Sequence, residues 1–168
     1  MKSDAIYIAL GANLPSAGRT PRATLAAALE QLAGTGVSVL ARSSDWHSPS
    51  WPDPTDPPYV NAVAEIETTL DAAGLLAHLH ATEAALGRRR TQPNAPRSID
   101  LDLIDFRGRT DTTRSGLVIP HPRATGRAFV LLPLQEIAPA WQDPVSGRGI
   151  GDLVAALPRA DVDAMYTL

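Results

Sequence analysis

Two kinds of apolar periodicity alternate through the first two thirds of the chain, and their order restricts the folds that it can adopt. Short runs that alternate in period two, or are briefly continuous, predict strands, and longer runs with apolar residues at helical spacing predict helices. The expected strands cover residues 5–10, 37–46, 59–68 and 96–104, and the expected helices cover 21–32 and 70–86. The order is therefore strand, helix, strand, strand, helix, strand.

Turn and cap signals support the first helix and its surroundings. Thr20 suits an N-cap with Pro21 as the first helical residue. Gly34 and Gly36 suit the end of that helix. A turn is expected at residues 11–13, where Gly-Ala-Asn follows the first apolar run.

The element order is the split βαβ pattern of a ferredoxin-like α+β sandwich, in which helices pack on one face of an antiparallel sheet. Additional C-terminal elements are expected after this unit: a short strand at 117–119 and short helices at 129–137 and 151–157. Two Pro-rich loops, 49–58 and 88–96, would then lie around an exposed face of the sheet.

Composition narrows the classes of function. With 168 residues the chain is expected to form one domain over 1–168, without a membrane span or a signal peptide. The absence of cysteine excludes disulfides and thiolate metal sites. A net charge of −3 argues against a general nucleic-acid or membrane-surface binder. We therefore expect a cytoplasmic monomer that acts on small molecules and binds neither nucleic acid nor membrane.

Asp100 and Asp102 form the most informative pair of residues. In a strand they face one side, opposite to Ile99, Leu101 and Leu103. Strand geometry separates their Cα atoms by roughly 6.5–7 Å, and two charges at that distance repel by about 2 kcal/mol at an effective dielectric near 20. One or two divalent cations with hard oxygen ligands would remove this repulsion. The alternative is a solvated strand face that happens to carry two carboxylates.

The basic residues are unevenly distributed. Fourteen of the fifteen are arginine, and nine of these lie between Arg88 and Arg127. Arginine forks match phosphate oxygens two at a time, so an Arg-rich region beside carboxylates suggests a phosphate-bearing ligand with metal. The run 88–90 opens the second Pro-rich loop and Arg97 closes it, three residues before Asp100. We expect this loop to close over a polyphosphate.

Two further sets of residues suggest a nucleotide and a flat ring. His121 lies between two prolines and near Arg127, which makes it a candidate phosphate donor. Tyr59 and Asn61 share one face of their strand, and an amide suits a heteroaromatic edge that Tyr59 and Phe129 could stack upon. Core packing of the two aromatic side chains, and a structural role for the histidine, remain the alternatives.

With these pieces assembled, the chain resembles the 6-hydroxymethyl-7,8-dihydropterin pyrophosphokinase (HPPK) family of folate biosynthesis. The resemblance runs from about residue 6 to about residue 139. It rests on the segments Ala9-Leu10-Gly11-Ala12-Asn13-Leu14, Tyr59-Val60-Asn61-Ala62, Glu83 to Arg88, Pro96-Arg97-Ser98-Ile99-Asp100-Leu101-Asp102, and Pro120-His121-Pro122-Arg123 with Arg127-Ala128-Phe129-Val130-Leu131.

The resemblance implies a ferredoxin-like fold, ATP as co-substrate, two Mg²⁺ ions, and transfer of the pyrophosphoryl group of ATP to the pterin hydroxymethyl oxygen with release of AMP. It implies that Asp100 and Asp102 hold both ions and that Arg88 and Arg97 neutralise charge during transfer. For ATP and for the pterin it implies two sets of contacts. The ATP set is His80, Glu83, Arg90, His121 and Arg127, and the pterin set is Ser48, Trp51, Tyr59, Asn61 and Phe129.

The chain departs from the pattern of many family members in its second loop. Asn94 and Ala95 stand where an aromatic residue and glycine are common, and the loop is about one residue shorter. The assignment among Arg88, Arg89 and Arg90 therefore stays open. His80 also stands where many members carry glutamine.

Two rival functions share some of these features. A metal-dependent nucleotidyl transferase also uses an Asp-x-Asp strand, but it should carry a Gly-Ser pair, and here the pair is Gly11-Ala12. A ferredoxin-like RNA-binding module needs exposed aromatic residues on a basic sheet face, which two aspartates oppose.

Overall fold

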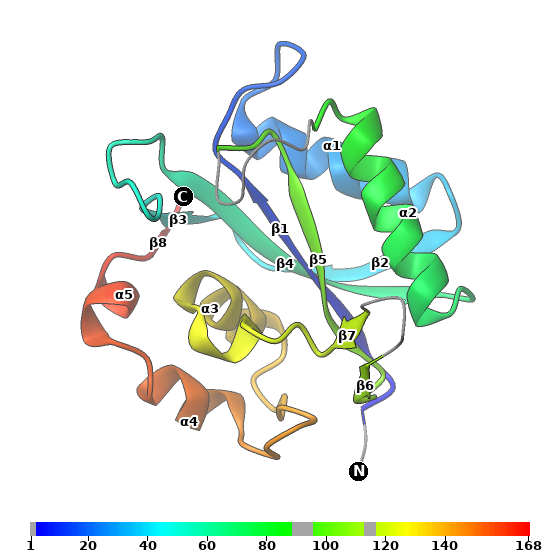
Figure 1. Cartoon of the computed structure of the whole chain (residues 1–168), viewed down its shortest axis with the longest axis vertical. Helices are drawn as coiled ribbons and strands as arrows, with labels where there is room; N and C mark the ends of the chain where they lie inside the picture. The colour runs from blue at the N-terminus through cyan, green and yellow to red at the C-terminus, as the bar shows by residue number, and fades with distance from the viewer. Residues whose placement is uncertain (1–2, 89–95, 113–116) are drawn as a thin grey trace.

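The computed structural model describes residues 3–88, 96–112 and 117–168, and its centre is a six-stranded sheet (Figure 1). The strands of this sheet are β1 (Ile6–Ala12), β2 (Val37–Arg42), β3 (Trp46–Ser48), β4 (Tyr59–Thr68), β5 (Asp100–Phe106) and β8 (Tyr166–Thr167). Two further strands, β6 (Asp111–Thr112) and β7 (Val118–Ile119), form a separate two-stranded sheet. The helices are α1 (Pro21–Ala33), α2 (Ala72–Ala85), the 3₁₀ turn η1 (Ala124–Gly126), α3 (Ala128–Ile137), α4 (Ile150–Ala155) and α5 (Arg159–Asp163).

The sheet has the topology that the element order predicts. Its strands follow the order β5-β1-β4-β3-β8, with β2 also paired to β4, and every ladder is antiparallel. If β2 and β3 are taken together as one interrupted strand, the unit is βαββαβ, and the ferredoxin-like α+β fold is confirmed. The two short strands β6 and β7 pair only with each other among the described residues.

Helices α1 and α2 cover one face of the sheet. The Thr20 hydroxyl accepts a hydrogen bond from Ala23 N at 3.2 Å, so α1 begins at the expected cap. Asp71 Oδ1 accepts one from Gly74 N at 2.7 Å and caps α2, which begins later than the expected residue 70. The core on this face joins alternate residues of β1 and β5 to the inward leucines of the helices, including Ile6, Ile8, Leu10, Leu101, Leu103, Leu25, Leu32, Leu75 and Leu79.

The other face of the sheet is partly covered too, which corrects the expectation that helices occupy one face only. A second core packs Tyr7, Ala9 and Val63 against Leu131 and Leu134 of α3 (Figure 1). Strand β1 is therefore buried on both faces over most of its length, and it reads as a continuous apolar run for that reason. Gly11, near the end of β1, is less buried than the rest of the strand.

Three expected boundaries were wrong. The strand expected at 96–104 covers Asp100–Phe106 instead, because its pairing with β1 runs over those residues. The strand expected at 37–46 is interrupted between β2 and β3, where the Ser43 hydroxyl accepts the hydrogen bond of Val63 N at 2.9 Å in place of a main-chain carbonyl. The turn expected at 11–13 starts later, because Gly11 and Ala12 still pair with β4. A glycine between two neighbouring strands keeps its place in the ladder at little steric cost.

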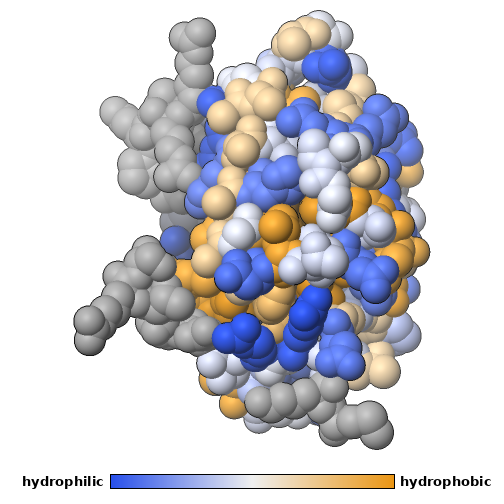
Figure 2. Space-filling model, turned by 90° about the vertical axis from the view of Figure 1, so that its right-hand side faces the viewer, coloured by the Kyte–Doolittle hydropathy of each residue, from blue (hydrophilic) through white to orange (hydrophobic). Residues whose placement is uncertain are grey.

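The outward surface of α2 is not strongly polar. Ala73, Ala77 and Ala81 are exposed on this helix, and Figure 2, which views the molecule from the side of α2, shows hydrophobic residues among hydrophilic ones. None of the helices in the described ranges combines the length with the apolar character that crossing a membrane requires.

Candidate active site

Adjacent strands bring Asp100 and Asn61 onto one row of the sheet. Asp100 on β5 pairs with Gly11 on β1, and Gly11 pairs with Asn61 on β4. Directly opposite residues share a face, so the carboxylate and the amide are on the same side, two strand spacings or roughly 10 Å apart. A Cβ built on Gly11 would meet Asn61 Oδ1 at 3.4 Å and Tyr59 Cδ1 at 3.8 Å. Because Gly11 has no side chain, the space between the Asp100 carboxylate and the Asn61 amide stays open.

Two arginines contact Asp100 from different parts of the chain. Arg88 Nη1 donates to Asp100 Oδ1 at 2.8 Å, and Arg97 Nη1 donates to Asp100 Oδ2 at 2.9 Å. Arg88 Nη1 also lies 2.6 Å from Glu83 Oε2. Burial alone would lower the pKa of Arg88, but Asp100 and Glu83 raise it above its ordinary value. The guanidinium therefore stays charged between two carboxylates.

Glu83 links α2 to the start of β5. Its side chain is buried, and its Oε1 accepts a hydrogen bond from Leu101 N at 2.7 Å, while Oε2 pairs with Arg88. Burial raises the pKa of Glu83, and the hydrogen bond from Leu101 and the charge of Arg88 only partly oppose that rise. Both oxygens have protein partners, so Glu83 fixes Arg88 beside Asp100.

Asp102 faces the same side as Asp100, one pleat further along β5. Burial and then the charge of Asp100 raise the pKa of Asp102 from 3.8 to about 7, against the opposing charge of Arg127. The ionised form of Asp102 is disfavoured beside a second carboxylate, so a bound cation at this position would stabilise it.

His121 and Arg127 complete the charged side of the site. Burial and then the neighbouring Arg127 and Arg123 lower the pKa of His121, so its ring is neutral at pH 7. His121 Nδ1 accepts a hydrogen bond from Arg123 N at 3.2 Å, which assigns the ring proton to Nε2. A neutral donor beside Arg127 suits a phosphate oxygen.

Asn61 is buried and held from β3. Its Nδ2 donates to Ser48 Oγ at 2.8 Å and to Trp46 O at 3.3 Å. These bonds orient the amide so that Oδ1 faces Gly11. Ser48, which the family resemblance implies as a pterin contact, lies in β3 and is also the partner that holds Asn61.

Sequence reasoning missed the role of Asn13. Its buried side chain donates to Pro57 O at 3.0 Å and accepts from Arg97 N at 2.9 Å, and its main-chain N donates to Arg97 O at 3.1 Å. Asn13 thus ties the end of β1 to the first Pro-rich loop and to Arg97. In the sequence Asn13 is only an amide residue that follows a predicted strand. Its hydrogen-bond partners are 44 and 84 residues away in the chain.

Comparisons with known proteins identify the family of this chain. The family model for 7,8-dihydro-6-hydroxymethylpterin-pyrophosphokinase (HPPK) matches residues 7–139. The chain belongs to the HPPK family. It is 42% identical over 158 residues to the 2-amino-4-hydroxy-6-hydroxymethyldihydropteridine pyrophosphokinase of Methylorubrum extorquens, which covers 94% of this chain and 96% of that protein. It is 35% identical to the enzyme of the same name from Pseudomonas aeruginosa, over 95% of this chain and 96% of that protein.

Solved structures of bifunctional relatives share the fold. The Plasmodium falciparum HPPK-DHPS wild-type structure matches with a TM-score of 0.67 and 12% identity, over 92% of this chain and 44% of that one. This chain therefore spans less than half the length of that solved protein. It also covers 21% of the Pneumocystis carinii folic acid synthesis protein fol1, at 35% identity over 160 residues.

The remaining residues expected in an HPPK site differ in how exposed they are. Phe129 is 36% exposed, and the Arg127 guanidinium lies 5.3 Å from the centroid of its ring. Trp51 is 71% exposed in the first Pro-rich loop. His80 is exposed on α2, one turn before Glu83. Arg90 lies outside the described residues.

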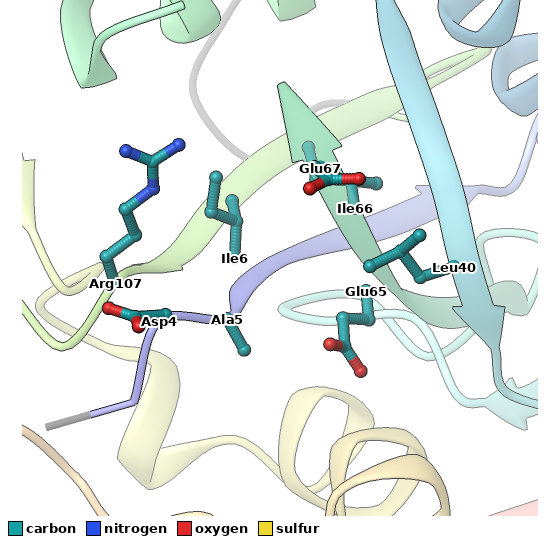
Figure 3. Close-up of a pocket in the computed structure, with 8 residues that line it drawn as sticks. All are labelled: Asp4, Ala5, Ile6, Leu40, Glu65, Ile66, Glu67 and Arg107. Carbon is teal, nitrogen blue, oxygen red and sulfur yellow. The ribbon is translucent and has the colours of Figure 1, made fainter. Parts of the chain in front are cut away.

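A separate pocket lies at the opposite end of β1 and β5 from Asp100. It has a volume of about 380 Å³, and it is lined by Asp4, Glu65, Glu67 and Arg107 together with apolar residues (Figure 3). Three carboxylates against one guanidinium disfavour a polyphosphate. This pocket contains none of the residues expected in the HPPK site, and we do not assign it a ligand.

The donor set at β5 fits magnesium. Within residues 3–88, 96–112 and 117–168, no group of three or more His, Asp or Glu side chains forms a metal cage. Mg²⁺ is usually held by one or two carboxylates together with waters and substrate phosphates, so a pair of aspartates is sufficient. The raised pKa of Asp102 marks the charge that such an ion would balance.

Proposed function

We propose a division of roles among the described residues for the reaction that defines the HPPK family. As a member of that family, the chain is an ATP-dependent diphosphotransferase of folate biosynthesis. It transfers the pyrophosphoryl group of ATP to the hydroxymethyl group of 6-hydroxymethyl-7,8-dihydropterin, which gives AMP and the pterin diphosphate. The pterin hydroxyl oxygen forms a bond to the β-phosphorus, and the bond from that phosphorus to the α-phosphate oxygen breaks, so that AMP leaves. The hydroxyl proton is released to solvent.

Asp100 and Asp102 are the proposed ligands of two Mg²⁺ ions. When bound, the ions would supply positive charge that offsets the negative charge of the ATP phosphates during transfer. The observation that carries this proposal is the pair of carboxylates on one face of β5. Arg88 and Arg97 are bound to Asp100, and the charge of Arg127 acts on Asp102.

Arg88 and Arg97 are the proposed catalytic arginines. Each contacts Asp100, so each guanidinium is within side-chain reach of phosphates held by metal at that carboxylate. His121 and Arg127 are proposed to bind the phosphates of ATP, with His80, Glu83 and Arg90 as further predicted contacts. Glu83 would act mainly through Arg88, because both of its oxygens are engaged.

Tyr59, Asn61 and Phe129 are the proposed pterin residues. Asn61 Oδ1 is the group that would accept hydrogen bonds from the edge of the heterocycle, while Ser48 holds the amide nitrogen. Burial raises the pKa of Tyr59 in spite of the nearby Arg97, so its phenol stays neutral and its ring suits stacking. Trp51, which is exposed, is the proposed contact from the first Pro-rich loop.

A product assay tests the function. With ATP, Mg²⁺ and the pterin, AMP and pterin diphosphate are expected, whereas free pyrophosphate would indicate nucleotidyl transfer. Asp102→Ala is expected to lose turnover while it keeps the wild-type circular dichroism spectrum. A folded variant with full turnover would contradict the metal assignment.

We expect the enzyme to act as a cytoplasmic monomer, on the basis of its composition. Light scattering coupled to size exclusion measures the mass directly, and 17.8 kDa is the expected value. A mass near twice that value would contradict the expectation.

A further inference from the structure

Strand β3 is only three residues long, yet it determines how Asn61 is held. Ser48 Oγ and Trp46 O, which accept hydrogen bonds from the Asn61 amide nitrogen, both belong to this strand. A shift of β3 relative to β4 would therefore turn the amide that faces the proposed pterin position. A strand of this length makes few ladder hydrogen bonds and needs support from other elements.

That support comes from Glu136 near the end of α3. Its Oε1 accepts hydrogen bonds from Ser44 N at 2.9 Å and Ser44 Oγ at 2.8 Å, and its Oε2 accepts one from Trp46 Nε1 at 2.9 Å. Burial opposes ionisation, but these three hydrogen bonds together outweigh it and lower the pKa of Glu136. One carboxylate thus joins α3 to both the entry and the first residue of β3, across about 90 residues of sequence.

The outer edge of β3 is held by the C-terminal segment. Trp46 and His47 pair with Thr167 and Tyr166 of β8, and the rings of His47 and Tyr166 stack with their centroids 4.3 Å apart. The β8 side of these contacts lies beyond the part of the chain that the family model matches. With β4 on one edge and β8 on the other, Glu136 adds a contact to β3 from α3, while Arg22 and Arg42 bind Asp45 just before the strand.

Helix α3 also carries Phe129, seven residues before Glu136. Seven residues span about two helical turns, or roughly 10 Å. One helix therefore carries the proposed pterin residue Phe129 and also contacts the strand that holds Asn61.

We infer that Glu136 is a positioning residue for the pterin substrate, which it serves by holding β3 through Ser44 and Trp46 so that Ser48 keeps Asn61 in place. This inference rests on the pterin role proposed for Asn61. Glu136 itself is not expected to contact either substrate. Glu136 is hydrogen bonded to Ser44 and Trp46, and β3 in turn holds Asn61, so its replacement is expected to affect the pterin more than ATP.

Glu136→Gln is the test. The amide keeps the shape of the side chain but presents an NH₂ donor to either Ser44 or Trp46, so at least one acceptor is replaced by a donor. The dissociation constant and KM for the pterin are expected to rise about 3- to 10-fold, while KM for ATP and kcat stay within about twofold. Pterin binding is measured by titration calorimetry with a nonhydrolysable ATP analogue, alongside the melting temperature.

Glu30→Gln is the matched control. Glu30 is an exposed glutamate on α1, on the opposite face of the sheet, and its replacement removes the same charge. It is expected to leave both substrates unaffected. Trp46→Phe removes the indole donor, and the effect of Glu136→Gln on pterin binding should be smaller in that background, because the two groups act as a pair.

The possible results separate the hypotheses. Unchanged pterin binding by Glu136→Gln would overturn the inference, and so would equal weakening of both substrates with a lower melting temperature, which indicates a general structural role. A wild-type protein that binds the pterin without releasing AMP would count against the proposed reaction but leave this comparison valid. A wild-type protein that does not bind the pterin would overturn both.

Discussion

The guanidinium of Arg97 is hydrogen bonded to the carboxylate of Asp100, with Nη1 2.9 Å from Oδ2. Arg88 takes the other oxygen of the same carboxylate. A carboxylate that is proposed to bind Mg²⁺ is thus already paired with the two side chains that are proposed to bind phosphate. Binding of a metal–nucleotide complex would exchange these pairs: the ion would take the carboxylate and the arginines would take the phosphates.

Arg97→Gln is expected to lower kcat by about 10²- to 10³-fold, because a charge that balances the transferring phosphates is lost. ATP affinity should fall much less, since His121 and Arg127 remain. Steady-state kinetics and calorimetry with an ATP analogue provide the two values. Arg159→Gln on α5, whose side chain is 88% exposed, is the control and should retain full turnover. Full turnover by Arg97→Gln would contradict the catalytic role.

Asp102→Asn is expected to abolish turnover and to stabilise the fold at pH 8. The folded state raises the pKa of Asp102 from 3.8 to about 7, so between about pH 4 and pH 7 it keeps a proton that the unfolded state has lost. Wild-type stability from this group is therefore lost as the pH rises through that window, and asparagine avoids the loss.

The gain that Asp102→Asn is expected to bring in the free energy of unfolding is roughly 1–3 kcal/mol at pH 8, falling towards zero near pH 4. Urea unfolding with EDTA at pH 4, 6 and 8 measures it. The opposite trend, with the gain largest at pH 4, would show that burial and Asp100 do not raise this pKa.

Ser48→Ala removes the closer partner of the Asn61 amide. Both residues are buried, so the amide would keep only the 3.3 Å contact with Trp46 O. We expect a loss of about 1–2 kcal/mol in the free energy of unfolding and weaker pterin binding with little change in ATP binding. Ser38→Ala on β2, where the serine is exposed, is the control. Equal weakening of both substrates would argue against a pterin-side role.

Gly11→Ala tests whether the space between Asp100 and Asn61 must stay free of a side chain. The backbone of Gly11 is not left-handed, and the nearest atom to an added Cβ is Asn61 Oδ1 at 3.4 Å, so folding should be nearly unaffected. The methyl group would stand where the substrates are proposed to lie, and KM for the pterin is expected to rise about tenfold. A normal melting temperature with unchanged kinetics would place the substrates elsewhere.

Much of the fold follows from local patterns. The period-two run that contains Asp100 and Asp102 predicts both the strand and its polar face, because successive side chains of a strand point to opposite sides. The caps at Thr20 and Asp71 likewise depend on neighbouring residues only. The motif residues that indicate the HPPK family also lie in short, continuous segments.

Contacts between segments that are far apart in the sequence were decided by the tertiary structure. The break at Ser43 depends on Val63 across the sheet, the second core depends on α3 docking against β1, and Asn13 acts through Pro57 and Arg97. The sequence by itself determined which side chains are available for phosphate, metal and ring binding. Their assembly depends on contacts between distant segments, such as Glu136 with β3, which form only when the apolar surfaces of the sheet and helices are buried together.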